Sequence, residues 1–198
     1  MNQKITFGFK VEEQVDFGFP YISQKRADGT NHGYADLKRQ PDLLGTIPEL
    51  AGWTELEEIV RQLNEPGSVF KTVGCDAGAV ACEFDTYSQK VGCYIHIAFD
   101  EFEFNTKQSY YDLVYSGLYY HAQDFEIVGR VHVLGTLKPT RFQDFGGRLG
   151  YTLSLDVSGL GNNVPEGRAA WSEAMPILAD AFKRLSDGWE TFKLQAEV

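Results

Sequence analysis

The feature that most constrains this fold is the alternation of apolar and polar residues, which recurs in several separate stretches of the chain. Such alternation indicates strands that bury one face and expose the other. These stretches are 4–11, 15–22, 91–99, 126–135 and 148–157, and two more strands are expected at 68–75 and 79–87. The first two stretches are expected to form a hairpin that turns through 12–14. The sequence therefore predicts a mostly antiparallel sheet of about six to eight strands.

Turn residues divide the central part of this pattern. Asp76-Ala77-Gly78 and residues 88–90 are expected to be turns, so that 68–99 forms a three-stranded meander. A loop containing Pro139 and Gly146-Gly147 is expected between the last two strands.

Helical periodicity marks other segments. Residues 54–64 carry apolar side chains at helical spacing, and Thr54 with Glu57 predicts a capping box at the start. Residues 106–122 are rich in tyrosine, contain few helix breakers and also favour a helix. In the C-terminal helical region Pro176 is expected to kink the helix or to begin a second one. With these helices on one face of the sheet, the predicted fold class is α+β.

The connection from residue 24 to residue 52 has no periodicity and contains two prolines. A connection of this length inside a compact domain is often a binding loop or a lid. The alternative is a surface excursion with one short helical turn near Ala35 to Arg39. No repeat and no linker interrupts the chain, so one domain over residues 1–198 is expected.

Charge narrows the classes of partner. The chain has 28 acidic and 18 basic residues, a formal net charge of −10, and 14% aromatic residues. A protein this acidic repels phosphate backbones and anionic lipid, which argues against nucleic acid and membranes as partners. The N-terminus lacks the apolar core of a secretory signal, and no apolar run approaches the roughly 18 residues of a membrane span. A cytoplasmic protein is expected.

The cysteines do not predict a metal site. The spacing of Cys75, Cys82, Cys93 and His96 lacks the short ligand pairs of structural zinc sites. On a strand, Cys93 and His96 also point to opposite faces. The odd number and wide spacing of the cysteines favour buried thiols in a reducing compartment. We expect neither a metal nor another cofactor.

The leading functional interpretation is a non-catalytic binding protein. Tyr111, Tyr115 and Tyr119 lie on one stripe of the predicted helix, with Glu101 and Glu103 just before it. Tyrosines framed by acidic side chains are typical of recognition surfaces for a basic protein. One version is an acidic neutralising partner of a toxin or nuclease, as immunity and antagonist proteins are. Buried tyrosines with satisfied hydroxyl groups are the structural alternative, and self-association through this surface is another.

A second interpretation is a small-ligand-binding protein or a hydrolase-like enzyme. Strand alternation places Tyr94 and His96 opposite the apolar face of one strand, Arg130 and His132 on another, and Asp156 on a third. If these strands are neighbours, the side chains share one surface, on which acid–base chemistry or phosphate binding is feasible. The residues 24–52 would then form a lid. The common nucleophile, nucleotide and zinc-hydrolase motifs are absent from the sequence.

Overall fold

The structure is a computed structural model that describes residues 2–15, 17–26, 29–84 and 87–196. Its main sheet has the strand order β2-β9-β10-β7-β6, with β3 beside the far end of β9. The strands of this sheet are β2 (Thr6–Val11), β3 (Phe17–Phe19), β6 (Phe70–Phe84), β7 (Tyr87–Phe99), β9 (Arg130–Phe142) and β10 (Arg148–Gly161). Two small pairs accompany it: β1 (Asn2–Lys4) with β8 (Glu126–Val128), and β4 (Gln24–Arg26) with β5 (Gly29–Asn31).

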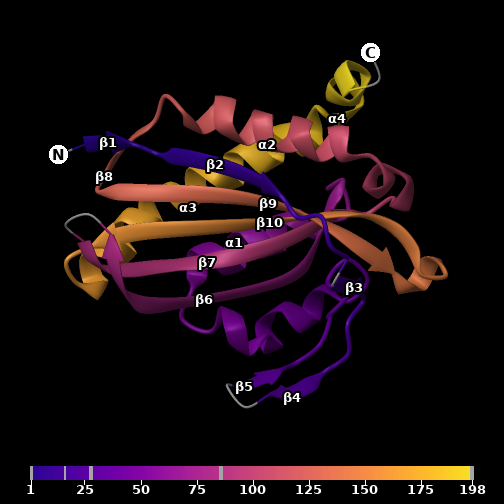
Figure 1. Cartoon of the computed structure of the whole chain (residues 1–198), viewed down its shortest axis with the longest axis horizontal. Coiled ribbons are helices and arrows are strands. Elements are labelled where there is room, and N and C mark those ends of the chain that lie inside the picture. Colours follow the sequence, from indigo (N-terminus) through magenta and orange to yellow (C-terminus); the bar gives the residue numbers. More distant parts are fainter. Residues whose placement is uncertain (1, 16, 27–28, 85–86, 197–198) are drawn as a thin grey trace.

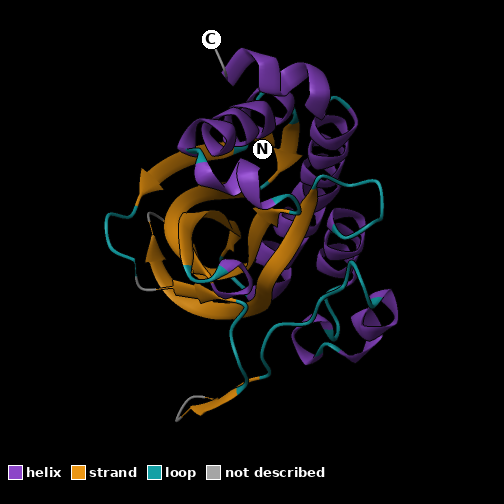
Figure 2. Cartoon of the chain, turned by 90° about the vertical axis from the view of Figure 1, so that its right-hand side faces the viewer, coloured by secondary structure: helices purple, strands orange, loops and turns teal. Residues whose placement is uncertain are grey.

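Helices pack against one face of this sheet. They are α1 (Thr54–Leu63), α2 (Gln108–Ala122), α3 (Val164–Asp187) and the short α4 (Trp189–Phe192). Single 3-10 turns are η1 (Pro41–Thr46), η2 (Pro48–Leu50), η3 (Phe102–Thr106), η4 (Gln143–Phe145) and η5 (Lys193–Ala196). The sheet is strongly curved, and the helices lie around its outer side (Figures 1 and 2). This arrangement confirms the predicted α+β fold class.

The main core lies between the sheet and the helices. Leu153, Leu155 and Val157 of the central strand β10 point into it and are fully buried, as are Trp171 and Leu178 of α3. Burial of one such side chain contributes about 2 kcal/mol to folding. The even-numbered residues of β10 therefore face the opposite, inner side of the curved sheet.

The inner face carries polar side chains in the middle and an aromatic cluster at one end. Ser154 of β10 lies beside His96 of β7, and Asp156 lies beside Tyr94. The aromatic cluster is formed by Phe17, Phe19, Phe102 and Phe142 with Val73 and Ala98. The sequence alternation thus identified the face correctly, and β7 and β10 are indeed neighbours.

The predicted N-terminal hairpin is wrong. Both β2 and β3 pair in parallel with β9, β2 along 132–137 and β3 along 140–142. The chain therefore continues along the same edge of the sheet and does not turn back at 12–14. Alternation alone cannot distinguish these two courses, because both bury the same set of side chains.

Three predicted breaks are also wrong, because the strands continue through them. Residues 76–78 belong to β6, where Gly78 pairs with Gly92 in the ladder, so the meander is one long hairpin of β6 and β7. The turn predicted at residues 88–90 is wrong as well, because these residues belong to β7, and residues 85–86 lie outside the described residues. Pro139 lies inside β9, opposite Tyr151. It falls between the stretches of β9 paired with β2 and β3, where the ladder does not need its missing N–H.

The predicted positions of the helices are confirmed, whereas the predicted capping box is wrong. The helices α1 and α2 confirm the predicted segments, and α3 continues through Pro176 as a single helix that ends at Gly188. The predicted capping box is wrong, because Trp53 is the N-cap residue and caps with no side-chain hydrogen bond. Its ring instead lies 4.0 Å from the guanidinium of Arg168. Among the described helices, none has the length and apolar character needed to cross a membrane.

Candidate functional site

A well-defined cavity lies along the free edge of β6. Its volume is about 390 Å³, and the five consecutive residues 72–76 of β6 line it. Successive side chains of a strand point to opposite faces of the sheet, so a cavity lined by all five must lie against the edge of the strand. The opposite wall comes from residues 32–35 and 46–49. We call this cavity the edge slot.

The long connection predicted as a binding loop or lid forms that opposite wall. Leu37 and Leu50 anchor it in the main core. Lys38 holds it to the end of α1 by donating hydrogen bonds to the carbonyl oxygens of Glu65, at 3.1 Å, and Ser68. The Lys38 ammonium also lies 3.9 Å from the Asp100 carboxylate. These contacts make the connection a fixed wall of the slot in this structure.

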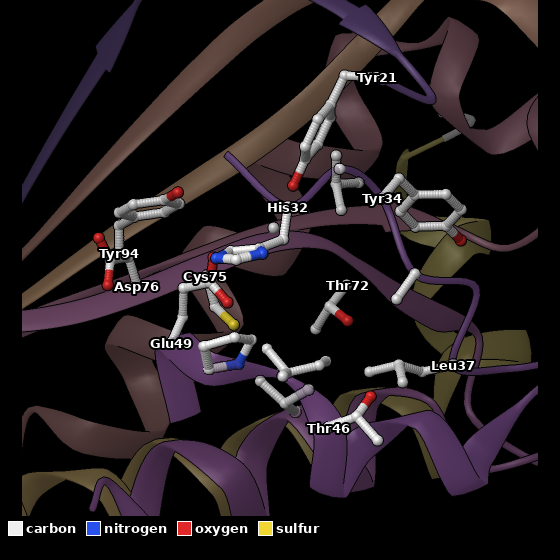
Figure 3. A pocket seen from close by; sticks show the side chains of 17 residues that line it. Tyr21, His32, Tyr34, Leu37, Thr46, Glu49, Thr72, Cys75, Asp76 and Tyr94 are labelled. Carbon is white, nitrogen blue, oxygen red and sulfur yellow. The ribbon is translucent and has the colours of Figure 1, made fainter. Parts of the chain in front are cut away.

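Three tyrosines line the slot. The Tyr34 ring lies 4.6 Å from the Phe19 ring, and its backbone N–H donates to the Tyr21 carbonyl at 3.1 Å. The Tyr21 hydroxyl lies directly over Gly74, where an added methyl group would be only 2.9 Å from it. Figure 3 shows the side chain of His32 between Tyr21 and the bottom of the slot, with Tyr94 and Tyr34 on either side.

The electrostatic field in the slot is negative. Burial, the Glu49 carboxylate and the Asp76 carboxylate raise the pKa of the Cys75 thiol to about 12. Burial also raises the pKa of Tyr94, with further contributions from Tyr21 and the same two carboxylates. The described residues that line the slot include no lysine or arginine. Cys75 therefore stays a neutral thiol at neutral pH, which disfavours nucleophilic catalysis and leaves the two carboxylates to define the charge.

A second cavity of about 240 Å³ lies on the inner face of the sheet and shares Asp76 and Tyr94 with the edge slot. Its floor includes Gly78 and Gly92, which pair across β6 and β7 and leave room because they have no side chains. Asp156 and Lys90 line it as well. Acidic groups therefore extend from the slot onto the inner face.

The structure brings only part of the predicted His/Arg/Asp face together. Tyr94 and Asp156 are neighbours, but His132 lies beside Ser158 and His96 beside Ser154. The two imidazoles are thus four residues apart along β10, about 13 Å, and on strands at its two sides. Arg130, beside Leu160, lies farther still from His96. A single site that uses both imidazoles and the guanidinium is not formed.

His96 is also poorly suited to proton transfer. It is buried, its Nε2 lies 2.6 Å from the Thr152 hydroxyl, and the Phe17 ring lies 4.7 Å from its own ring. Burial, with a smaller effect of the Lys138 charge, lowers the pKa of His96 to about 3. A base this weak accepts few protons near neutral pH. This hydrogen bond and the packing against Phe17 indicate a structural role for His96.

The predicted tyrosine-helix surface is only partly exposed. Tyr111 is buried, and its hydroxyl donates to the Tyr151 carbonyl at 2.7 Å. Tyr115 packs against Phe9, with ring centroids 4.7 Å apart, whereas Tyr119 is 41% exposed.

Glu101 and Glu103 are exposed just before α2, at the end of the helix away from Tyr119. The eleven helical steps from Gln108 to Tyr119 span about 16 Å. The acidic and exposed aromatic members of the predicted surface are therefore well separated.

Of the residues that define the slot, the sequence analysis predicted Tyr94 and missed the others. Tyr21 and Tyr34 come from irregular segments, Glu49 lies in the 3-10 turn η2, and Asp76 was interpreted as a turn residue. The long aperiodic connection was a second signal that pointed here. In the part of the chain that the structure describes, no cluster of three or more His, Cys, Asp or Glu side chains is suited to a metal ion.

Comparisons of the chain with protein-family models, with curated proteins and with solved structures find no significant match.

Proposed function

We propose that this protein is a non-catalytic binding protein for a basic protein partner, and that the edge slot receives a cationic side chain of that partner. The observation that carries the proposal is the composition of the slot: three tyrosines and the carboxylates of Glu49 and Asp76, with no lysine or arginine among its described lining residues. An inhibitor of the immunity or antagonist type is one form of such a protein.

The chemistry of the slot suits a guanidinium or ammonium group. Carboxylates form strong charge-assisted hydrogen bonds with these cations, and aromatic faces attract them. Glu49 and Asp76 both line the slot, and the charge of each contributes to the raised pKa of the Cys75 thiol beside them. A cation that enters would be attracted to the same volume.

The whole chain supports the same class of partner. A net charge of −10 accelerates encounter with a basic protein and disfavours encounter with another acidic one. The three cysteines form no disulfide, which supports a reducing compartment and hence the cytoplasm as the place of action.

The test compares two double variants with the same change in charge. Wild-type protein first captures partners from the source cells, and mass spectrometry identifies them. Each captured protein is then purified and titrated against the wild type, E49Q/D76N and E101Q/E103Q. Loss of the two slot carboxylates is expected to weaken binding on the order of 100-fold, because each charge-assisted contact contributes about 1.5 to 3 kcal/mol. The E101Q/E103Q variant is expected to stay within about threefold of the wild type.

Three results would overturn the proposal. One is a partner that is not basic, and another is unchanged affinity in E49Q/D76N. The third is a larger loss of affinity in E101Q/E103Q, which would move the binding surface to the start of α2. Thermal unfolding of both variants serves as the control for intact folding.

A further inference from the structure

We infer that the basic partner binds as an extended segment that adds a strand to the free edge of β6, with two adjacent basic residues directed at Glu49 and Asp76. This inference rests on the proposed function and specifies its binding mode. Strand addition of this kind uses main-chain hydrogen bonds for affinity and side-chain pockets for specificity.

The slot lies where a further strand of the sheet would lie. In the described structure β6 pairs only with β7, so its other edge faces the slot over residues 72–76. A ligand in the slot therefore lies in the plane of the sheet. That is the position of a next strand, about 4.8 Å from β6.

Beyond the slot, the edge of β6 is exposed and uncharged. Residues 78–81 read Gly-Ala-Val-Ala, carry no charge and are exposed, and the Val80 side chain is 58% exposed. Proteins normally protect such edges with charged side chains or covering segments. The opposite edge of the sheet follows that rule, because the Tyr115 hydroxyl donates to the Gly8 carbonyl of β2 and Lys10 lies 3.9 Å from Glu12. The edge of β6 is the exception.

Asn64 defines where an added strand must stop. Its side chain accepts a hydrogen bond from the Thr72 N–H at 3.2 Å and donates to the Thr72 hydroxyl at 2.7 Å. The same amide donates to the Val60 carbonyl at 2.7 Å, which fixes it to α1. Beyond Thr72, residues 73–81 have no strand partner on this side in the described structure, and all except the buried Val73 are at least partly exposed. This length suits a strand of about eight residues.

The carboxylates along the edge of β6 favour a basic strand over a second copy of this chain. In an antiparallel pair of two copies of β6 centred between Ala79 and Val80, Asp76 of each copy would face Glu83 of the other. Like charges directly opposite destabilise a ladder, which disfavours a second copy. A basic strand in the same place would face these carboxylates with opposite charge.

The two slot carboxylates also predict a pattern within the segment. Asp76 lies on the inner face with Tyr94, whereas Glu49 lies beside Cys75 on the side of α1 (Figure 3). Neighbouring residues of a strand point to opposite faces. Two adjacent basic residues would therefore reach one carboxylate each.

The test uses blocked eight-residue peptides. The probe is Thr-Val-Thr-Arg-Arg-Thr-Val-Thr. Comparison peptides replace both arginines with glutamate, separate them by one residue, or carry backbone N-methyl groups at odd or at even positions. Binding is measured by calorimetry, and hydrogen exchange reports on the amides of residues 73–81.

Binding of the probe with slower exchange at 73–81 is expected. At least tenfold weaker binding is expected for the glutamate peptide, for one of the two methylated peptides and for E49Q/D76N protein. The peptide with separated arginines is expected to bind at least threefold more weakly than the probe.

The outcomes separate this inference from the proposed function. Equal binding of the probe and both methylated peptides, with unchanged exchange at 73–81, would overturn strand addition and leave recognition of a basic group standing. In another outcome, the probe peptide fails to bind while the E49Q/D76N variant still has lower affinity for the purified partner than the wild type. That result would likewise overturn strand addition and leave recognition of a basic group standing. If sedimentation shows that the wild type is a dimer and that the V80K variant is a monomer, strand addition by a basic partner is overturned. The edge of β6 would then pair with a second copy of this chain.

Discussion

At the scale of single residues, His96 predicts a specific dependence of stability on pH. Burial lowers the pKa of His96 from its ordinary 6.5 to about 3 in the folded protein. In the unfolded chain the pKa returns to about 6.5, so unfolding takes up a proton between these two values. The stability contributed by the neutral imidazole is therefore present above pH 6.5 and is lost as the pH falls toward 3.

The measurement compares the wild type with H96Q, which keeps a polar group near the Thr152 hydroxyl. Between pH 7 and pH 5 the free energy of unfolding of the wild type is expected to fall by about 2 kcal/mol more than that of H96Q. Urea unfolding at both pH values gives this difference directly, and all other titrating groups are shared by the two proteins. Parallel pH profiles would contradict a buried, neutral His96.

At the scale of elements, the contact between β10 and α3 depends on glycines. A methyl group on Gly159 would lie 2.2 Å from the carbonyl oxygen of Gly167 and 2.6 Å from the backbone nitrogen of Trp171. Both atoms belong to the backbone of α3, so the helix would have to move away from the strand. We expect G159A to lower the free energy of unfolding by about 3 kcal/mol.

The matched control is G67A, in the turn after α1. A methyl group there meets no atom within 4 Å, and this variant is expected to be neutral or slightly stabilising. Denaturant unfolding of both variants tests the comparison. Equal midpoints for G159A and wild type would show that the close approach of α3 to β10 is not needed for stability.

The helices and strands also show how much of the fold could be predicted from the sequence. Periodicity depends on which side chains are buried, so it correctly identified α1, α2 and the two faces of β10. It could not predict that β3 continues along β9, or that β6 passes through 76–78, because pairing partners decide both. The edge slot could not be predicted for the same reason, because Glu49 and Asp76 come to line one cavity only once the long connection folds against β6.

At the scale of the whole molecule, net charge and the open edge of β6 act together. A net charge of −10 opposes association of copies at neutral pH, and this net repulsion vanishes near the pI of about 4.8. The uncharged edge at 78–81 then becomes the most favourable place for copies to pair. We expect the wild type to aggregate near its pI and V80K to aggregate several-fold less.

The control for this prediction is V128K. Val128 on β8 is 62% exposed and Val80 on β6 is 58% exposed, so both variants add one positive charge at a similarly exposed valine. Light scattering is recorded as a function of pH, and each protein is compared at its own isoelectric point. Because net charge is then zero in all three proteins, a reduction confined to V80K would assign the aggregation to the β6 edge. Equal reductions in both variants would assign it to charge alone and would remove the special role of that edge.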